Sequence, residues 1–281
     1  MAGASMKDIK LRIKSVESTM QITKAMQLVA TSKLRRAKER MEMSKPYAEI
    51  SRKAVMAAVA DCDDVTAPFV APREVKKRCY VVIAGDRGLA GGYNSNIFKA
   101  VAAHGEGTPY CVLPLGRKAV EKFQRAGVES LSNDYVRVEG MSVGCCYKLA
   151  QLLIDGYQAE KYDDVYLVYT SFRTMMSQDV VIEQLLPIPR QEEAESAQIS
   201  TIYELSPAET LQAIVPDFLA GRVYSALCDS YASEVASRRS AMDSATKNAG
   251  EMIGDLRLKY NRARQGAITQ EITEIVAGAE Q

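Results

Sequence analysis

The chain has 281 residues, of which 47% are hydrophobic and 25% charged, and its formal net charge is +1. The length suffices for one large globular domain with extra elements or for two small domains, and the composition excludes a disordered chain. A single histidine, His104, and the absence of tryptophan leave little material for imidazole catalysis or for a metal site. No cofactor is expected on these grounds.

Residues 6–58 carry apolar or small side chains at a spacing that alternates between three and four. The members of this seam are Ile9, Ile13, Val16, Met20, Thr23, Ala30, Leu34, Ala37 and Met41, with Gln27 as the one plainly polar member. Such a heptad pattern predicts a helix of about fifty residues, roughly 75 Å long, whose seam needs a partner helix along its length. Pro46 removes one backbone hydrogen bond, so we expect a bend there.

The middle of the chain has a different pattern, which follows a linker expected at residues 61–73. Short apolar runs at 79–84, 110–115, 165–171 and 180–188 alternate with helix-like segments near 94–103, 117–126 and 143–160. This alternation predicts an α/β domain of the Rossmann-like kind with a largely parallel sheet, and it leaves the order of the strands open. The polar stretch 190–200 is expected to be a loop.

A second long helix is expected to start at Ser206. Serine is a good N-cap, Pro207 suits the first turn, and Glu209 suits the positive end of the helix dipole. Its seam is predicted to contain Val235, Met242, Ala245, Ala249, Met252, Leu256, Ala263 and Ala267. Two long helices that leave the same side of one domain run antiparallel, so we expect an antiparallel two-helix coiled coil whose second helix projects past the first. The predicted division is 1–60, 61–205 and 206–281.

The six cysteines are scattered without a CxxC pair, and most lie in apolar runs, which favours a reduced, cytosolic setting. We expect no signal or transit peptide, since helix-like sequence starts at about Met6. No uncharged apolar run approaches the ~20 residues of a membrane span, so the chain is expected to reach a membrane only through partners.

Both ends of the chain carry recognisable motifs. The segments QITKAMQLVATSKLRRAKERM (21–41) and NAGEMIGDLRLKYNRARQGAITQEITEIVAGA (248–279) closely resemble the two helices of ATP synthase gamma subunits. The segments GDRGLAGGYNSNIF (85–98), IEQLLPI (182–188) and IYE (202–204) resemble further motifs of that family, in the family's order. The likeness covers essentially the whole chain.

The resemblance implies a non-catalytic rotating shaft of a bacterial F-type ATP synthase. In that family the coiled coil fills a ring of three alpha and three beta subunits, and the globular foot sits on the membrane c-ring with the epsilon subunit. The implied location is the cytoplasmic side of the bacterial inner membrane, as a peripheral protein that does not insert into it. The shaft would couple proton or sodium flow to ATP synthesis or hydrolysis and would regulate ATPase activity.

The resemblance also implies roles for particular residues. Beta-subunit contact or coupling falls on Met26, Asp86, Arg87, Arg238, Arg264, Gln265, Thr269 and Glu271. Contact of the foot with the membrane ring falls on Tyr203 and Glu204. The chain departs from the family where Asp243 precedes Lys247, since the family often has a lysine followed by an aspartate four residues on. Leu205 and Arg239 also replace residue types that are common in the family, proline and an apolar residue.

Two features have rival interpretations. The loop GDRGLAGGYN follows a strand and precedes a helix, as phosphate-binding loops do, but its glycine spacing fits neither nucleotide motif, so we interpret it as a tight turn. Residues 7–53 contain thirteen Lys or Arg against five Asp or Glu. A basic helix also suits nucleic acid, yet few aromatic residues interleave it, and attraction to acidic protein loops explains it better. A nucleotide-binding enzyme and a coiled-coil adaptor remain the alternative functions.

Overall fold

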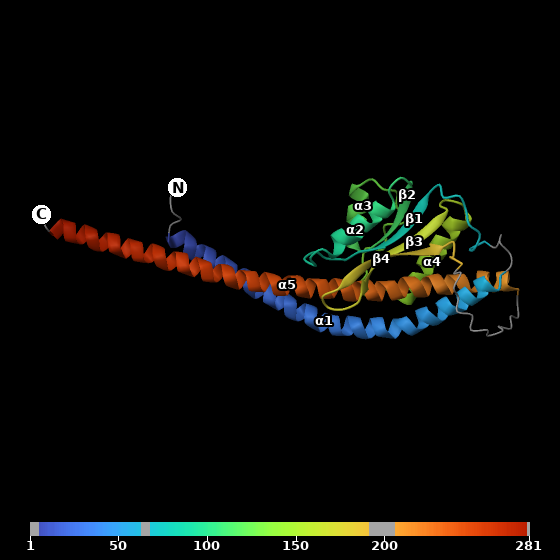
Figure 1. Ribbon diagram of the computed structural model, residues 1–281, viewed down its shortest axis with the longest axis horizontal. Coiled ribbons are helices and arrows are strands. Elements are labelled where there is room, and N and C mark those ends of the chain that lie inside the picture. The colour runs from blue at the N-terminus through green and yellow to red at the C-terminus, as the bar shows by residue number, and fades with distance from the viewer. Residues whose placement is uncertain (1–5, 63–67, 191–205, 280–281) are drawn as a thin grey trace. The chain divides into compact units, whose positions relative to one another are not determined.

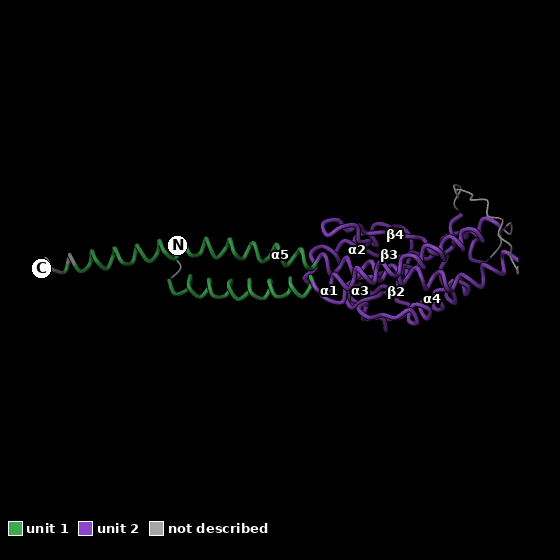
Figure 2. The backbone as a smooth tube through the Cα atoms, turned by 90° about the horizontal axis from the view of Figure 1, so that it is seen from below, with its two compact units in different colours: residues 1–31, 238–281 green, residues 32–237 purple. Residues whose placement is uncertain are grey.

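The computed structural model describes residues 6–62, 68–190 and 206–279. In chain order the elements are α1 (Met6–Ala60), β1 (Arg78–Ile83), α2 (Tyr93–His104), β2 (Tyr110–Leu115), α3 (Arg117–Arg125), α4 (Val143–Gln158), β3 (Asp164–Phe172), β4 (Gln178–Leu186) and α5 (Pro207–Ala279). They form two compact units (Figure 2): unit 1 comprises residues 1–31 and 238–281, and unit 2 residues 32–237. Both terminal helices contribute to both units. The sequence-based division at residues 60 and 205 follows the ends of these helices, and as a division into domains it stays a prediction.

Unit 1 is an antiparallel pair of helices. Glu17 pairs with Arg257 at 2.9 Å, whereas Thr23, further along α1, meets Thr246, which comes earlier in α5. The residue numbers therefore rise along one helix as they fall along the other, as predicted. Within this unit α5 continues alone past the start of α1 (Figure 2). From residue 268 to residue 275 every side chain of α5 is exposed.

The predicted seam of α1 is confirmed residue by residue. Its members from Ile9 to Met20 are half-buried, and Thr23, Ala30, Leu34, Ala37 and Met41 are buried. On α5 the prediction fails at one position, because Met252 is 46% exposed and Ile253 is buried in its place. The step from Ala249 to Leu256 can be taken as three then four residues or as four then three. Both choices put an apolar residue in the seam, so spacing alone did not decide between them.

Unit 2 is built around a four-stranded sheet with the order β2-β1-β3-β4. The first three strands are parallel, and β4 runs antiparallel to β3 at the edge of the sheet. The predicted largely parallel sheet is thus confirmed, and the strand order, which the sequence left open, is now known. Alternate residues of each strand face opposite layers. Tyr80 and Val82 face α2 and α3, whereas Val81 and Ile83 face the side covered by α4, α5 and α1 (Figure 1).

Local sequence features act on both long helices, at the start of α5 and at the proline within α1. Ser206 and Glu209 form a capping box at the start of α5: the Ser206 N–H donates to the Glu209 carboxylate at 3.0 Å, and the Glu209 N–H donates to the Ser206 hydroxyl at 3.3 Å. At Pro46 the helix α1 is not interrupted and continues to Ala60. Figure 1 draws this part of α1 as a gentle curve rather than a sharp kink. Residues 63–67 of the expected linker and residues 191–200 of the expected loop lie outside the described residues.

Candidate functional site

Met26 lies half-buried on α1 in unit 1, beside a layer of polar residues between the two helices. The hydroxyls of Thr23 and Thr246 lie 2.8 Å apart, and the Gln27 side-chain amide donates to the Asp243 carboxylate at 2.8 Å. These bonds satisfy polar groups that would otherwise weaken the seam. They join α1 and α5 at positions 23 and 27, on either side of Met26 along α1.

Asp243 also takes part in an ion pair with Lys247, whose ammonium lies 2.7 Å from the carboxylate. The hydrogen bond from Lys247 is the main reason that the pKa of Asp243 is lowered. The spacing of four residues between Asp243 and Lys247 is visible in the sequence, but the hydrogen bond from Gln27 to the same carboxylate is not. An acid at position 243 therefore suits the amide donor that faces it.

The remaining predicted contact residues of unit 1 are all on α5. Arg238 is half-buried at the beginning of the unit, whereas Arg264, Gln265, Thr269 and Glu271 are exposed. The Thr269 hydroxyl donates to the Gln265 carbonyl at 2.9 Å, which is a bond within the helix. On the same stretch Ile268, Ile272 and Ile275 are exposed at 47%, 56% and 70%. This end of α5 thus displays polar and apolar side chains together.

Asp86 and Arg87 follow β1 in unit 2 and have different surroundings. The Asp86 carboxylate accepts the backbone N–H of Val138 at 3.0 Å and that of Glu139 at 3.1 Å. It therefore fastens the loop after β1 to residues 138–141, which precede α4. Arg87 is exposed. In this loop Asp86 holds the backbone, whereas the side chains of Arg87 and Leu89 are exposed.

The segment 138–141 is in turn held by both long helices. Lys33 of α1 lies 2.6 Å from the Glu139 carboxylate, and the Tyr231 hydroxyl of α5 donates to it at 2.9 Å. The Lys33 hydrogen bond is the main cause of a lowered pKa at Glu139. Arg40 of α1 donates to the Met141 carbonyl at 2.6 Å. Unit 2 is thus braced where α1, α5 and the loop after β1 come together.

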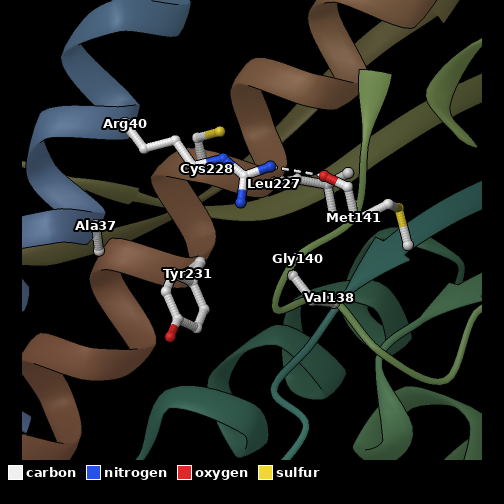
Figure 3. A pocket seen from close by; sticks show the side chains of 8 residues that line it. All are labelled: Ala37, Arg40, Val138, Gly140, Met141, Leu227, Cys228 and Tyr231. Atoms are coloured by element: carbon white, nitrogen blue, oxygen red, sulfur yellow. Dashed lines mark hydrogen bonds between the residues drawn. The ribbon is translucent and has the colours of Figure 1, made fainter. Parts of the chain in front are cut away.

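A small cavity lies at this point (Figure 3). Its volume of about 10 Å³ is close to the space that one water molecule needs. Arg40 from α1 and Tyr231 from α5 line it, together with Cys228, whose pKa is raised by burial. A cavity of this size belongs to the packing of the joint between elements and offers no room for a nucleotide.

Two predicted contact residues cannot be placed, because Tyr203 and Glu204 lie outside the described residues.

The sequence reasoning also missed a feature of α5 in unit 2. A row of polar side chains there is buried against the sheet, and it comprises Asp229, Ser230, Ser233 and Glu234. The signal was available, since these residues share one helical face in a segment that is otherwise apolar.

The comparisons with known proteins cover nearly the whole chain. A family model described as ATP synthase matches residues 5–281. A gamma chain of the ATP synthase from Ruminococcus albus is 44% identical over 97% of this chain and 96% of its own length. The gamma chain from Geobacter metallireducens is 43% identical over 99% and 98%. The chain belongs to the ATP synthase gamma-chain family. The resemblance seen in its terminal motifs is thereby confirmed.

Solved structures of the ATP synthase agree with the gamma-chain fold. A chain of the central stalk and c-ring of the Tetrahymena thermophila mitochondrial enzyme matches with a TM-score of 0.61 and 25% identity, over 80% of this chain and 99% of that one. A chain of the Euglena gracilis mitochondrial enzyme, with a TM-score of 0.68 and 16% identity, covers 98% and 93% and supports the fold alone. The ATP synthase is a membrane-associated complex. Within residues 6–62, 68–190 and 206–279, none of the helices of this gamma chain contains an apolar stretch of the length that a membrane span requires.

Proposed function

We propose that this gamma chain is the central rotating shaft of a bacterial F-type ATP synthase and performs no chemistry itself. It couples proton or sodium flow through a membrane ring to ATP synthesis or hydrolysis in the beta subunits, and it regulates the ATPase activity. Family membership supports this proposal, and the observation that carries it is the antiparallel pairing of the two chain ends in unit 1.

The physical basis is asymmetry. Unit 1 consists of two different helices, so it has no threefold symmetry. Met26 lies half-buried on α1, whereas Arg264 and Glu271 are exposed on α5. A shaft of this kind contacts three chemically identical subunits differently at any moment. Each contact then favours a different conformation of the subunit that it touches, so rotation shifts the populations of the three catalytic states.

The proposed partners are three alpha and three beta subunits, the epsilon subunit and the membrane c-ring. In this proposal Met26, Arg238, Arg264, Gln265, Thr269 and Glu271 contact the beta subunits or serve coupling, as do Asp86 and Arg87 of unit 2. Tyr203 and Glu204 contact the membrane ring. The chain is a peripheral protein on the cytoplasmic side of the bacterial inner membrane, and it binds no nucleic acid.

Two alternatives make different predictions. A nucleotide-binding enzyme would bind nucleotide as an isolated chain. A coiled-coil adaptor unrelated to energy conversion would have no affinity for alpha and beta subunits. A rotor chain instead binds the alpha and beta subunits and changes the ATPase rate only when both are present.

Reconstitution tests the proposal directly. Alpha and beta subunits are assembled with and without this chain, and the multi-site ATPase rate is measured at saturating ATP. We expect the chain to raise the rate, because it imposes different states on the three catalytic sites. A variant shortened after Arg264 serves as a control for the contact of the C-terminal segment. Equal rates with and without the full chain would exclude the rotor function.

A further inference from the structure

The carboxyl end of the sheet in unit 2 is where α/β proteins usually bind ligands. In open sheets the ligand crevice lies where the connections of two neighbouring strands leave in opposite directions. Here that point is between β1 and β3, because the chain leaves β1 toward β2 on one side and leaves β3 toward β4 on the other. The pairing of β1 with β3 ends at Val82 and Val168, whereas β3 continues to Phe172. The last residues of β3 therefore have no partner strand on this side.

Side chains of α5 take the place of that strand. The Thr170 N–H donates to the Ser230 hydroxyl at 3.3 Å, and the Ser233 hydroxyl donates to the Thr170 carbonyl at 3.1 Å. The Phe172 N–H donates to the Asp229 carboxylate at 3.1 Å. The backbone groups that β1 leaves unpaired are thus satisfied by one face of a helix.

The β1 side of the crevice is closed by the same helix. The hydroxyls of Tyr93 and Ser230 lie 2.7 Å apart, so Ser230 connects the start of α2 with β3. A Cβ atom at Gly85 would lie 2.8 Å from the Glu234 side chain. Because α5 approaches the loop after β1 so closely, the space that a ligand would need is filled by the chain itself.

The contacts of α5 in this crevice fix more than its distance from the sheet. Ser230 and Ser233 are 0% exposed, and their hydrogen bonds depend on the direction of each hydroxyl. Apolar side chains tolerate small rotations of a helix, but a rotation of α5 about its axis breaks these bonds and leaves buried backbone groups unpaired. The Ser237 hydroxyl, at 2.7 Å from the Gln178 side-chain oxygen, extends the same row to the start of β4.

We propose that Asp229, Ser230 and Ser233 form a torsional joint, in which α5 occupies the ligand crevice of the α/β domain and is locked against rotation on the sheet. This proposal rests on the proposed rotor function. The joint passes torque between unit 2 and the shaft helix through side-chain to backbone hydrogen bonds. The three residues act as positioning residues, since they touch neither substrate nor catalytic site.

The test uses ATP synthase reconstituted in lipid vesicles with variants of this chain. In the double variant Ser230→Ala/Ser233→Ala we expect a several-fold loss of the steady-state proton gradient driven by ATP. The ATPase rate with an ionophore present, which removes the load, is expected to stay within about twofold of the wild-type rate. The matched control is Ser225→Ala, because Ser225 is a buried serine of α5 with no hydrogen bond to the sheet among the described residues. The Ser225→Ala variant is expected to keep both the wild-type proton gradient and the wild-type ATPase rate.

Asp229 provides an independent variant in case the double variant does not fold. Asp229→Asn keeps an oxygen acceptor for the Phe172 N–H and is expected to pump normally, whereas Asp229→Ala is expected to lose pumping. Hydrogen exchange on the assembled complex gives a second measurement. The Phe172 amide is expected to exchange about tenfold faster in Asp229→Ala than in Asp229→Asn.

The outcomes separate the joint from the rotor function. A wild-type chain that fails to stimulate the ATPase overturns the rotor function itself. A wild-type chain that stimulates it, together with Asp229→Ala and double variants that pump as the wild type does, overturns the joint alone. Equal losses of pumping and of unloaded ATPase rate also overturn the joint, because they indicate a general loss of structure.

Discussion

Asp164 is an acid enclosed at the beginning of β3. It is 2% exposed, and its carboxylate lies 3.4 Å from the Arg78 guanidinium. Burial raises the pKa of Asp164 to about 6, and the charge of Arg78 only partly opposes this effect. Since the folded-state pKa is raised, the contribution to stability is full below the ordinary pKa of an aspartate and is lost as the pH rises through about 6.

We therefore predict that Asp164→Asn stabilises the chain above pH 7. The gain is at most about 3 kcal/mol, given 1.36 kcal/mol for each unit of pKa shift. Urea unfolding of the isolated chain, followed by circular dichroism from pH 4.5 to pH 8, measures it. The variant should lose the fall in stability that the wild type shows between pH 4.5 and pH 7. An unchanged slope in that range would contradict the assignment.

His104 also makes the stability of the fold depend on pH in this range, but with the opposite sign. Burial lowers its pKa, and its ring lies 2.7 Å from the Tyr80 hydroxyl. Because the neutral ring is favoured in the folded state, this contribution is lost as the pH falls. In Asp164→Asn the dependence that comes from Asp164 is lost and the one that comes from His104 is expected to remain, so the variant separates these two groups.

At the scale of whole elements, the sequence was most informative where a pattern repeats. The seam of α1 was predicted to single residues, because its apolar positions repeat over many turns, whereas on α5 the spacing between Ala249 and Leu256 allowed two choices. The strands were recognised from their apolar runs, but the order β2-β1-β3-β4 was not, since the same strands fit several orders. The role of Asp86 could not be predicted either, because its partners are backbone N–H groups of a segment far along the chain.

The ion pair of Asp243 and Lys247 permits a test on one helix. Exchanging the two residues, Asp243→Lys with Lys247→Asp, reverses the order of the charges. We predict that the fold is kept, because the Gln27 amide can turn its oxygen toward a lysine. The proton-to-ATP coupling ratio in vesicles is expected to change by less than about twofold, since an exposed ion pair contributes little. A large loss of ATP-driven proton pumping would refute this.

The exposed end of α5 gives a second prediction for an element. Removing residues 268–281 deletes side chains that are exposed wherever they are described, so the free energy of unfolding should change by less than about 0.5 kcal/mol. Torque transmission should fall much more, because Thr269, Glu271 and the exposed isoleucines are lost. Urea unfolding and ATP-driven pumping measure the two effects. A control with Ile268→Ser, Ile272→Ser and Ile275→Ser tells the apolar contacts from the polar ones.

For the whole molecule, the distribution of charge matters more than its sum. The net charge is only +1, yet residues 7–53 hold an excess of Lys and Arg, and Lys10, Lys14 and Lys24 are exposed on unit 1. Charges of this kind speed up the encounter with an acidic partner, and dissolved salt screens them beyond about 8–10 Å. We therefore expect the association rate with alpha and beta subunits to fall about tenfold between 0.05 M and 0.5 M salt.

Variants show whether this basic face is responsible. Lys10→Gln/Lys14→Gln/Lys24→Gln should slow association at low salt and flatten its salt dependence, with the dissociation rate nearly unchanged, because charges at the rim act mainly on encounter. Lys161→Gln, at an exposed lysine of unit 2, is the control and should behave like the wild type. Stopped-flow measurements at several salt concentrations give both rates. If the triple variant kept the wild-type slope, the excess of positive charge on α1 would be a solvated face with no part in assembly.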